Sequence, residues 1–150
     1  MATKATQMDV MSNKLIGHWE QAGQKLAALA EEIPESKFEF RPLDRVRSVG
    51  DILRHVAFWN RYVADSARGK KADNGANELP KEKFSTKKQV MDALNGSLAE
   101  TTEALKELKG GLSPEITDMV VSFIEHNSEH YGQLAVYARL NRIVPPASRG

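Results

Sequence analysis

Four stretches of this chain carry apolar side chains at intervals of three and four residues, and each stretch ends near a proline or a glycine. That spacing gathers the apolar side chains on one face of an α-helix. It predicts helices over about residues 9–32, 49–67, 85–109 and 114–141. Because each helix has one face to bury, the expected fold is all-α, a four-helix bundle.

Capping signals mark two of the helix starts. The segment from Ser48 to Asp51 resembles a capping box, in which the two end residues bond each other's backbone N–H groups. Ser113 is a preferred N-cap, and Pro114 suits the first helical position. The polar segment from Gly69 to Lys83 is interpreted as an exposed connection between the halves of the bundle. With 150 residues and 41% hydrophobic content, residues 1–150 are expected to form one domain.

Charge and cysteine content exclude several classes of protein. Lysine and arginine number 21 against 20 acidic residues, a balance too even for a nucleic-acid binder. The chain contains no cysteine, so disulfides, iron–sulfur clusters and thiolate zinc sites are ruled out. Its start lacks the apolar core of a signal peptide, and no apolar run is long enough to span a bilayer. We therefore expect a cytoplasmic protein with neither nucleic acid nor membrane as a partner.

Three histidines lie on predicted inward faces. His126 and His130 are four residues apart, which places their Cβ atoms roughly 5–6 Å apart on one helix face, so they can hold one metal ion between them. His55 shares a face of the second predicted helix with apolar residues, and a third imidazole would leave a coordination position open, as in catalytic zinc sites. Asp51, one turn earlier, could orient His55 or only cap the helix. The alternative is that each histidine is an isolated core residue bonded to a hydroxyl or carbonyl.

Further polar residues accompany the histidine pair. The string from His126 to His130 fits the H-x-x-E-H pattern of inverted zinc proteases, but residues 131–150 contain no acidic third ligand. Glu129 is a candidate base or a solvated acid. Gln133 and Tyr137, one turn on, are candidates for contact with a second substrate. Four arginines are interpreted as surface residues, with the lining of a mouth for an anionic substrate as the alternative: Arg54, Arg61, Arg139 and Arg142.

The segments 48–55, 126–134 and 141–148 resemble those of the DinB/YfiT-like family. This resemblance implies an up-down-down-up bundle, frequent homodimers, and a metal site made by one histidine on the second helix and an H-x-x-x-H pair on the last. All three ligand positions match, as His55, His126 and His130. The implied cofactor is a divalent metal, zinc or nickel before iron or manganese.

The resemblance also implies a reaction class. Characterised relatives include metal-dependent transferases and isomerases that use low-molecular-weight thiols such as bacillithiol, mycothiol or glutathione. We therefore expect a small-thiol-dependent transferase whose thiol arrives on a cosubstrate, because the chain has no cysteine of its own. A metal-dependent hydrolase and a metal-binding, stress-associated protein without turnover are the alternatives. A water-filled pocket above the open metal position would favour an enzyme.

Overall fold

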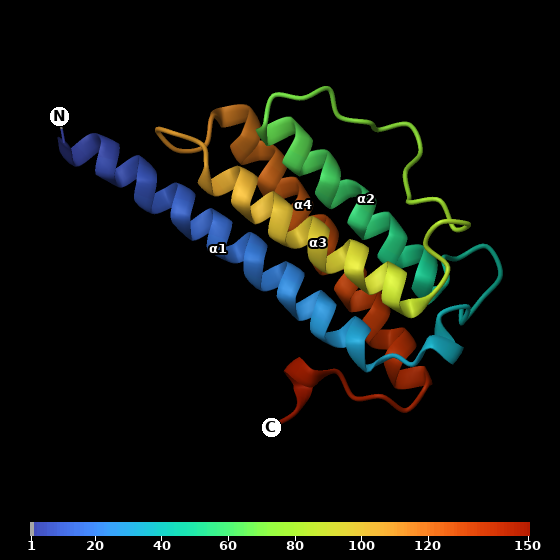
Figure 1. Cartoon of the computed structure of the whole chain (residues 1–150). Coiled ribbons are helices and arrows are strands. Elements are labelled where there is room, and N and C mark those ends of the chain that lie inside the picture. The colour runs from blue at the N-terminus through green and yellow to red at the C-terminus, as the bar shows by residue number, and fades with distance from the viewer. Residues whose placement is uncertain (1) are drawn as a thin grey trace.

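A computed structural model describes residues 2–150, and within that range it is helical with no strand (Figure 1). Four long helices are joined by loops, the first of which contains a short 3-10 turn, and a second 3-10 turn follows the last long helix. The elements are α1 (Ala2–Glu32), η1 (Glu35–Lys37), α2 (Val49–Ala67), α3 (Lys87–Lys106), α4 (Pro114–Leu140) and η2 (Pro146–Ser148). The predicted all-α four-helix bundle is confirmed.

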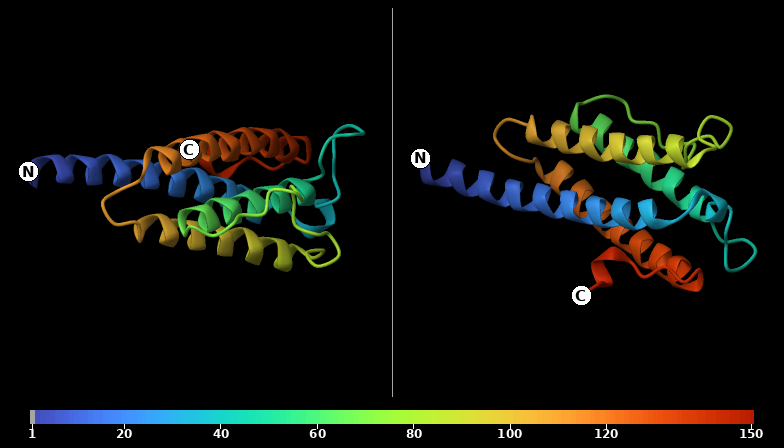
Figure 2. Two further views of the ribbon diagram at one scale, coloured as in Figure 1. Left: turned by 90° about the horizontal axis from the view of Figure 1, so that it is seen from above. Right: turned by 60° about the horizontal axis from the view of Figure 1, so that its bottom comes forward.

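The order of helix directions is up-down-down-up, as expected. α2 and α3 both run opposite to α1, and α4 runs with α1 (Figures 1 and 2). α2 packs along α3 and α1 along α4, while contacts of α1 with α3 and of α2 with α4 close the bundle. The contact between α2 and α4 brings the predicted metal-ligand positions of two distant segments to one seam.

The helix bounds follow the predicted caps at α2 and α4, and α1 and α2 end at Glu32 and Ala67, as predicted. The hydroxyl of Ser48 accepts from the Asp51 N–H at 3.1 Å, and the Asp51 carboxylate accepts from the Ser48 N–H at 3.2 Å. Thr86 and Gln89 form a second capping box at the start of α3, which the sequence reasoning did not identify.

Two predicted helix ends were wrong. α1 begins at Ala2 rather than near residue 9, because no proline or glycine interrupts the segment before it. α3 ends at Lys106 rather than Lys109. The chain there turns toward Gly110, whose φ of +81° lies in the left-handed region that glycine adopts without strain.

Along the bundle axis, the core consists of two apolar levels with a polar level between them. The first apolar level lies at the start of α2 and includes Leu26, Leu29, Ile52, Leu53, Leu94 and Leu134. The second lies at the other end and includes Trp19, Val63, Leu105 and Val120. Between them is a set of buried polar side chains, here called the middle layer: Asn60, Ser97, Thr101 and Asn127.

The connection from α2 to α3 is not simply exposed. It runs back along the bundle (Figure 1), and the Leu79 N–H donates to the Arg54 carbonyl of α2 at 3.3 Å. Leu79 is buried in a small cluster with Phe58 and Ala93. The prediction of an exposed segment from Gly69 to Lys83 is therefore wrong for Leu79, while most of the segment is exposed. Among the described residues, no helix is long and apolar enough to cross a membrane.

Candidate metal centre

The three predicted ligand positions meet at the seam between α2 and α4. One ring nitrogen from each of His55, His126 and His130 lies within 4.8 Å of the other two. The Nε2 atoms of His55 and His126 are 2.9 Å apart. Among the side chains that the structure describes, in residues 10–150, no other group of histidines and carboxylates comes together in this way.

Each imidazole is held through its Nδ1 atom. His55 Nδ1 donates to the Asn77 carbonyl at 2.7 Å, and His126 Nδ1 donates to Asn127 Oδ1 at 3.2 Å. His130 Nδ1 donates to Gln133 Oε1 at 3.0 Å. A carbonyl or amide oxygen can only accept, so all three rings carry their proton on Nδ1. Their Nε2 lone pairs are left free.

Lone pairs that face one another repel, whereas a cation placed between them would bind them all. With both Nδ1 atoms protonated, neutral His55 and His126 have no proton to place between their Nε2 atoms. Two zinc–nitrogen bonds of 2.0–2.1 Å at a tetrahedral angle would separate the nitrogens by about 3.3 Å, close to the spacing between these rings. The donor set, three neutral imidazoles, suits zinc and nickel among other transition metals.

Burial keeps the imidazoles neutral. It lowers the pKa of His55 to about 4, helped by the nearby Arg47 charge and opposed by the bond to Asn77. Burial also lowers the pKa of His126 to about 4, and it lowers the pKa of His130. Neutral imidazole is the form that binds metal, so at neutral pH the site needs no deprotonation before binding.

Asn77 anchors the α2–α3 connection to the site at two points. Besides its carbonyl bond to His55, its side-chain oxygen accepts from Trp59 Nε1 at 2.8 Å. Its φ of +66° lies in the left-handed region, which asparagine tolerates better than most residues. Asn77 was not predicted as a site residue, and Asp51 was expected either to orient His55 or to cap the helix. Asp51 caps α2 and pairs with Arg54 at 2.6 Å.

The middle layer supports His126 from the inside of the bundle. Asn127 Nδ2 donates to Asn60 Oδ1 at 3.2 Å, and Asn60 Nδ2 donates to Ser97 Oγ at 3.2 Å. Thr101 donates to the Asn60 carbonyl at 2.7 Å. The bond from His126 thus continues through α4 and α2 to α3.

His130 is supported along its own helix. Gln133 Nε2 donates to the Tyr137 hydroxyl at 3.1 Å, which in turn donates to the Arg47 carbonyl at 2.8 Å. Tyr137 is buried and its hydroxyl is engaged on both sides. Glu129 is exposed, and no hydrogen bond joins it to the histidines. Of the three predicted candidates, only Gln133 both contacts a histidine and lines a pocket.

Aromatic rings border the site toward the other end of α2. Trp59 stacks on Phe123 with ring centroids 5.5 Å apart, and Phe123 meets His126 edge-on at 5.4 Å. Tyr62 lies against Trp59 at 5.1 Å. These rings give the centre one apolar wall.

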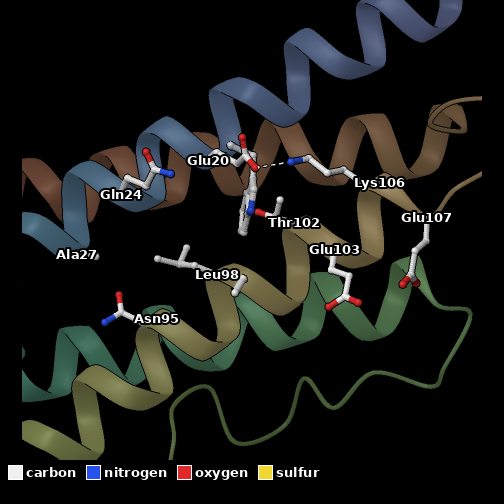
Figure 3. Close-up of a pocket in the computed structure, with 11 residues that line it drawn as sticks. Glu20, Gln24, Ala27, Asn95, Leu98, Thr102, Glu103, Lys106 and Glu107 are labelled. Atoms are coloured by element: carbon white, nitrogen blue, oxygen red, sulfur yellow. Dashed lines mark hydrogen bonds and ion pairs between the residues drawn. The ribbon is translucent and has the colours of Figure 1, made fainter.

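Two of the pockets lie in different parts of the molecule. One, of about 510 Å³, includes Gln133 and Arg47 and adjoins the centre. The other, of about 610 Å³, lies between α1 and α3 and contains no histidine. Figure 3 shows Lys106 and Glu20 reaching toward each other at this second pocket, 2.8 Å apart. None of the residues that line this second pocket belongs to the histidine centre or bonds to one of its imidazoles.

The fold and the site define a helical-bundle protein with a three-histidine candidate metal centre. The family model of the DinB superfamily matches residues 18–134, a stretch that contains all three histidines. The chain therefore belongs to the DinB superfamily, and the resemblance seen in its sequence is confirmed. No curated protein sequence matches it.

Proposed function

We propose that this protein is a divalent-metal-dependent transferase that uses a small thiol as cosubstrate. The observation that carries the proposal is the convergence of one ring nitrogen from each of three histidines, with each ring fixed by an acceptor at its Nδ1. Three protein ligands leave room for a further ligand on the ion. A bound zinc or nickel ion would lower the pKa of a thiol or a water there.

The chain's residues set the conditions for that chemistry. Asn77, Asn127 and Gln133 keep the imidazole lone pairs aimed at one point. Trp59 and Phe123 limit water on one side. The absence of cysteine means that a transferred sulfur must come from the cosubstrate.

Metal binding is tested on protein purified without an affinity tag. We expect one zinc or nickel ion per chain in wild type, and loss of it in His55→Ala and in His126→Ala after dialysis against a weak chelator. Replacement of the exposed His18 by alanine is the control and should leave metal content unchanged. Wild-type metal content in both site variants would refute the centre.

Thiol binding is tested by an optical readout. With cobalt or nickel loaded, a coordinating thiolate adds a charge-transfer band that water does not. Glutathione, bacillithiol, mycothiol and coenzyme A at millimolar concentration are the probes. If none gives a band, thiol transfer is rejected in favour of metal-dependent hydrolysis or of metal binding without turnover.

A homodimer is part of the same proposal. Val136, Leu140 and Val144 are apolar and more than half exposed near the end of α4, where a second copy would cover them. Light scattering on the purified protein distinguishes a dimer from a monomer. We also propose the cytoplasm as its location, which fractionation of cells would test.

A further inference from the structure

The pocket beside the centre is built mainly from one loop. Residues 41–47 form its outer side, α2 contributes one acid at its start, and the α2–α3 connection contributes another. α4 closes it with Gln133. Its lining consists of Arg41, Arg45, Val46, Arg47, Asp51, Glu78 and Gln133. Its volume of about 510 Å³ is in the range of small-molecule sites.

The pocket and the histidines share structural partners. Gln133 forms the pocket wall and accepts from His130 Nδ1 at 3.0 Å. Glu78 also lines the pocket, and it directly follows Asn77, which holds His55. Arg47 lines the same pocket as Gln133. A molecule in this pocket would therefore lie next to the centre.

The charges in the pocket leave a positive excess. Three guanidinium groups face two carboxylates, and both carboxylates already have partners. Asp51 pairs with Arg41 at 3.3 Å and with the buried Arg54 at 2.6 Å. Glu78 pairs with Arg47 at 3.3 Å.

Arg45 is the unsatisfied cation of the pocket. No hydrogen bond or ion pair joins its side chain to any of residues 10–150, and it is exposed. Its backbone has a φ of +68°, in the left-handed region, where arginine carries a strain cost. Arg41 braces the same loop by donating to the Val46 carbonyl at 3.0 Å. The loop thus holds Arg45 at the pocket.

We propose that this pocket binds an anionic group of the substrate, a carboxylate or a phosphate, with Arg45 as the principal contact and Arg47 beside it. A guanidinium matches the two oxygens of either group through paired N–H donors. The inference rests on the proposed function in one respect: it assigns the substrate of that metal centre to the small anions. Arg45 is thus a specificity-determining residue.

The arginines predicted as surface residues are separate from this pocket. Arg54 is only 2% exposed and donates to the Phe84 carbonyl at 3.0 Å, so the surface interpretation is wrong for it. Arg61 lies over the Phe84 ring. The pocket's arginines come instead from the loop before α2, which the helix-based reasoning did not consider.

The test is calorimetric titration of the purified full chain with succinate and with inorganic phosphate. Wild type should bind one of them saturably at millimolar concentration, and Arg45→Gln should weaken that affinity about tenfold, as expected for loss of a charged hydrogen-bond donor. Arg142→Gln is the matched control. Arg142 is also exposed with a positive φ, of +63°, but it does not line the pocket, so the variant should bind like wild type.

The two probes separate the two anions. Binding of succinate alone assigns a carboxylate, and binding of phosphate alone assigns a phosphate. Absence of saturable binding by both, or equal affinities in Arg45→Gln and wild type, would overturn the inference. A fall of the same size in Arg142→Gln would also overturn it, because the effect would then be one of net charge.

The experiment is independent of the thiol test. Succinate and phosphate contain no sulfur, so saturable binding without any thiolate band would reject thiol transfer and keep the anion pocket. A thiolate band without anion binding would reject the pocket alone.

Discussion

The middle layer and the apolar levels on either side of it stabilise the bundle by different means. The apolar levels gain free energy from burial, which is non-directional and depends on area and volume. In the middle layer, Asn60, Ser97 and Asn127 form a chain of hydrogen bonds, which depend on distance and angle. Sliding α4 along α2 would preserve much of the apolar contact but would break that chain.

The two kinds of packing contribute differently to the geometry of the centre. Hydrophobic packing brings α2 and α4 together, and the middle layer selects one register between them. His126 lies next to Asn127 in that register, opposite His55. The apolar levels therefore govern whether the chain folds, and the middle layer governs whether the three lone pairs meet.

Truncation of the fully buried Leu26 should affect stability strongly and metal binding little. Leu26→Ala removes apolar volume from the first level and should lower the free energy of unfolding by about 2–5 kcal/mol, measured by urea titration. Because α1 carries none of the three histidines, metal stoichiometry of the remaining folded protein should be unchanged. Loss of metal from protein that is still fully folded would contradict the proposal that the apolar levels govern folding and the middle layer governs metal binding.

Acid should act on the centre rather than on the apolar levels. In the metal-free protein, the pKa values of His55 and His126 lie at about 4 in the folded state, against about 6.5 when unfolded. The unfolded state then binds more protons between these values, so stability is present above pH 6.5 and is lost as pH falls toward 4. A shift of this size corresponds to about 3 kcal/mol for each of the two histidines.

Two variants assign this acid effect. The drop in unfolding free energy between about pH 7 and pH 4.5 should shrink in His126→Gln and persist in His18→Gln, whose exposed side chain lies outside the centre. An equal drop in wild type and both variants would place the titrating groups elsewhere.

Asn127→Ala should affect stability and metal binding together. It removes the acceptor of His126 Nδ1 and the donor to Asn60. We expect a loss of about 1–2 kcal/mol in stability and of about tenfold to hundredfold in metal affinity, the latter measured by competition with a chelator. Ser97→Ala is the control, because it breaks the same layer one bond farther from the imidazole. Equal metal affinities in the two variants would separate the middle layer from the centre.

The smallest effect is expected at Asn77. Asn77→Gly removes the bond to Trp59 but keeps the backbone carbonyl that holds His55, and glycine adopts a φ of +66° without strain. The gain and the loss nearly offset each other, so stability should change by less than about 1 kcal/mol. Metal affinity should stay close to wild type. A large fall in affinity would assign His55 support to the asparagine side chain.

The parts that could be predicted depend on short-range signals. The capping box at Ser48 fixes the start of α2, and the four-residue spacing of His126 and His130 places them on one face whatever surrounds them. Asn127 offered a weaker signal, because it stands seven residues from both Val120 and Leu134, on an otherwise buried stripe.

The parts that could not be predicted depend on contacts between distant segments. Asn77 reaches His55 only because Leu79 is buried against α2 and α3, and one apolar residue in a polar segment does not reveal that. The pocket arginines likewise become neighbours of Gln133 only when the loop before α2 meets α4. No local pattern in residues 41–47 indicates this meeting.

The order of the helices has a consequence for synthesis of the protein on the ribosome. α4 is the last long helix of the chain, yet it packs along α1, the first, and beside α2. Until α4 has left the exit tunnel, the apolar faces of α1 and α2 that it covers remain open to water. A nascent chain with only the first three helices thus exposes apolar surface until α4 has been synthesised. Chaperones would bind it during this interval.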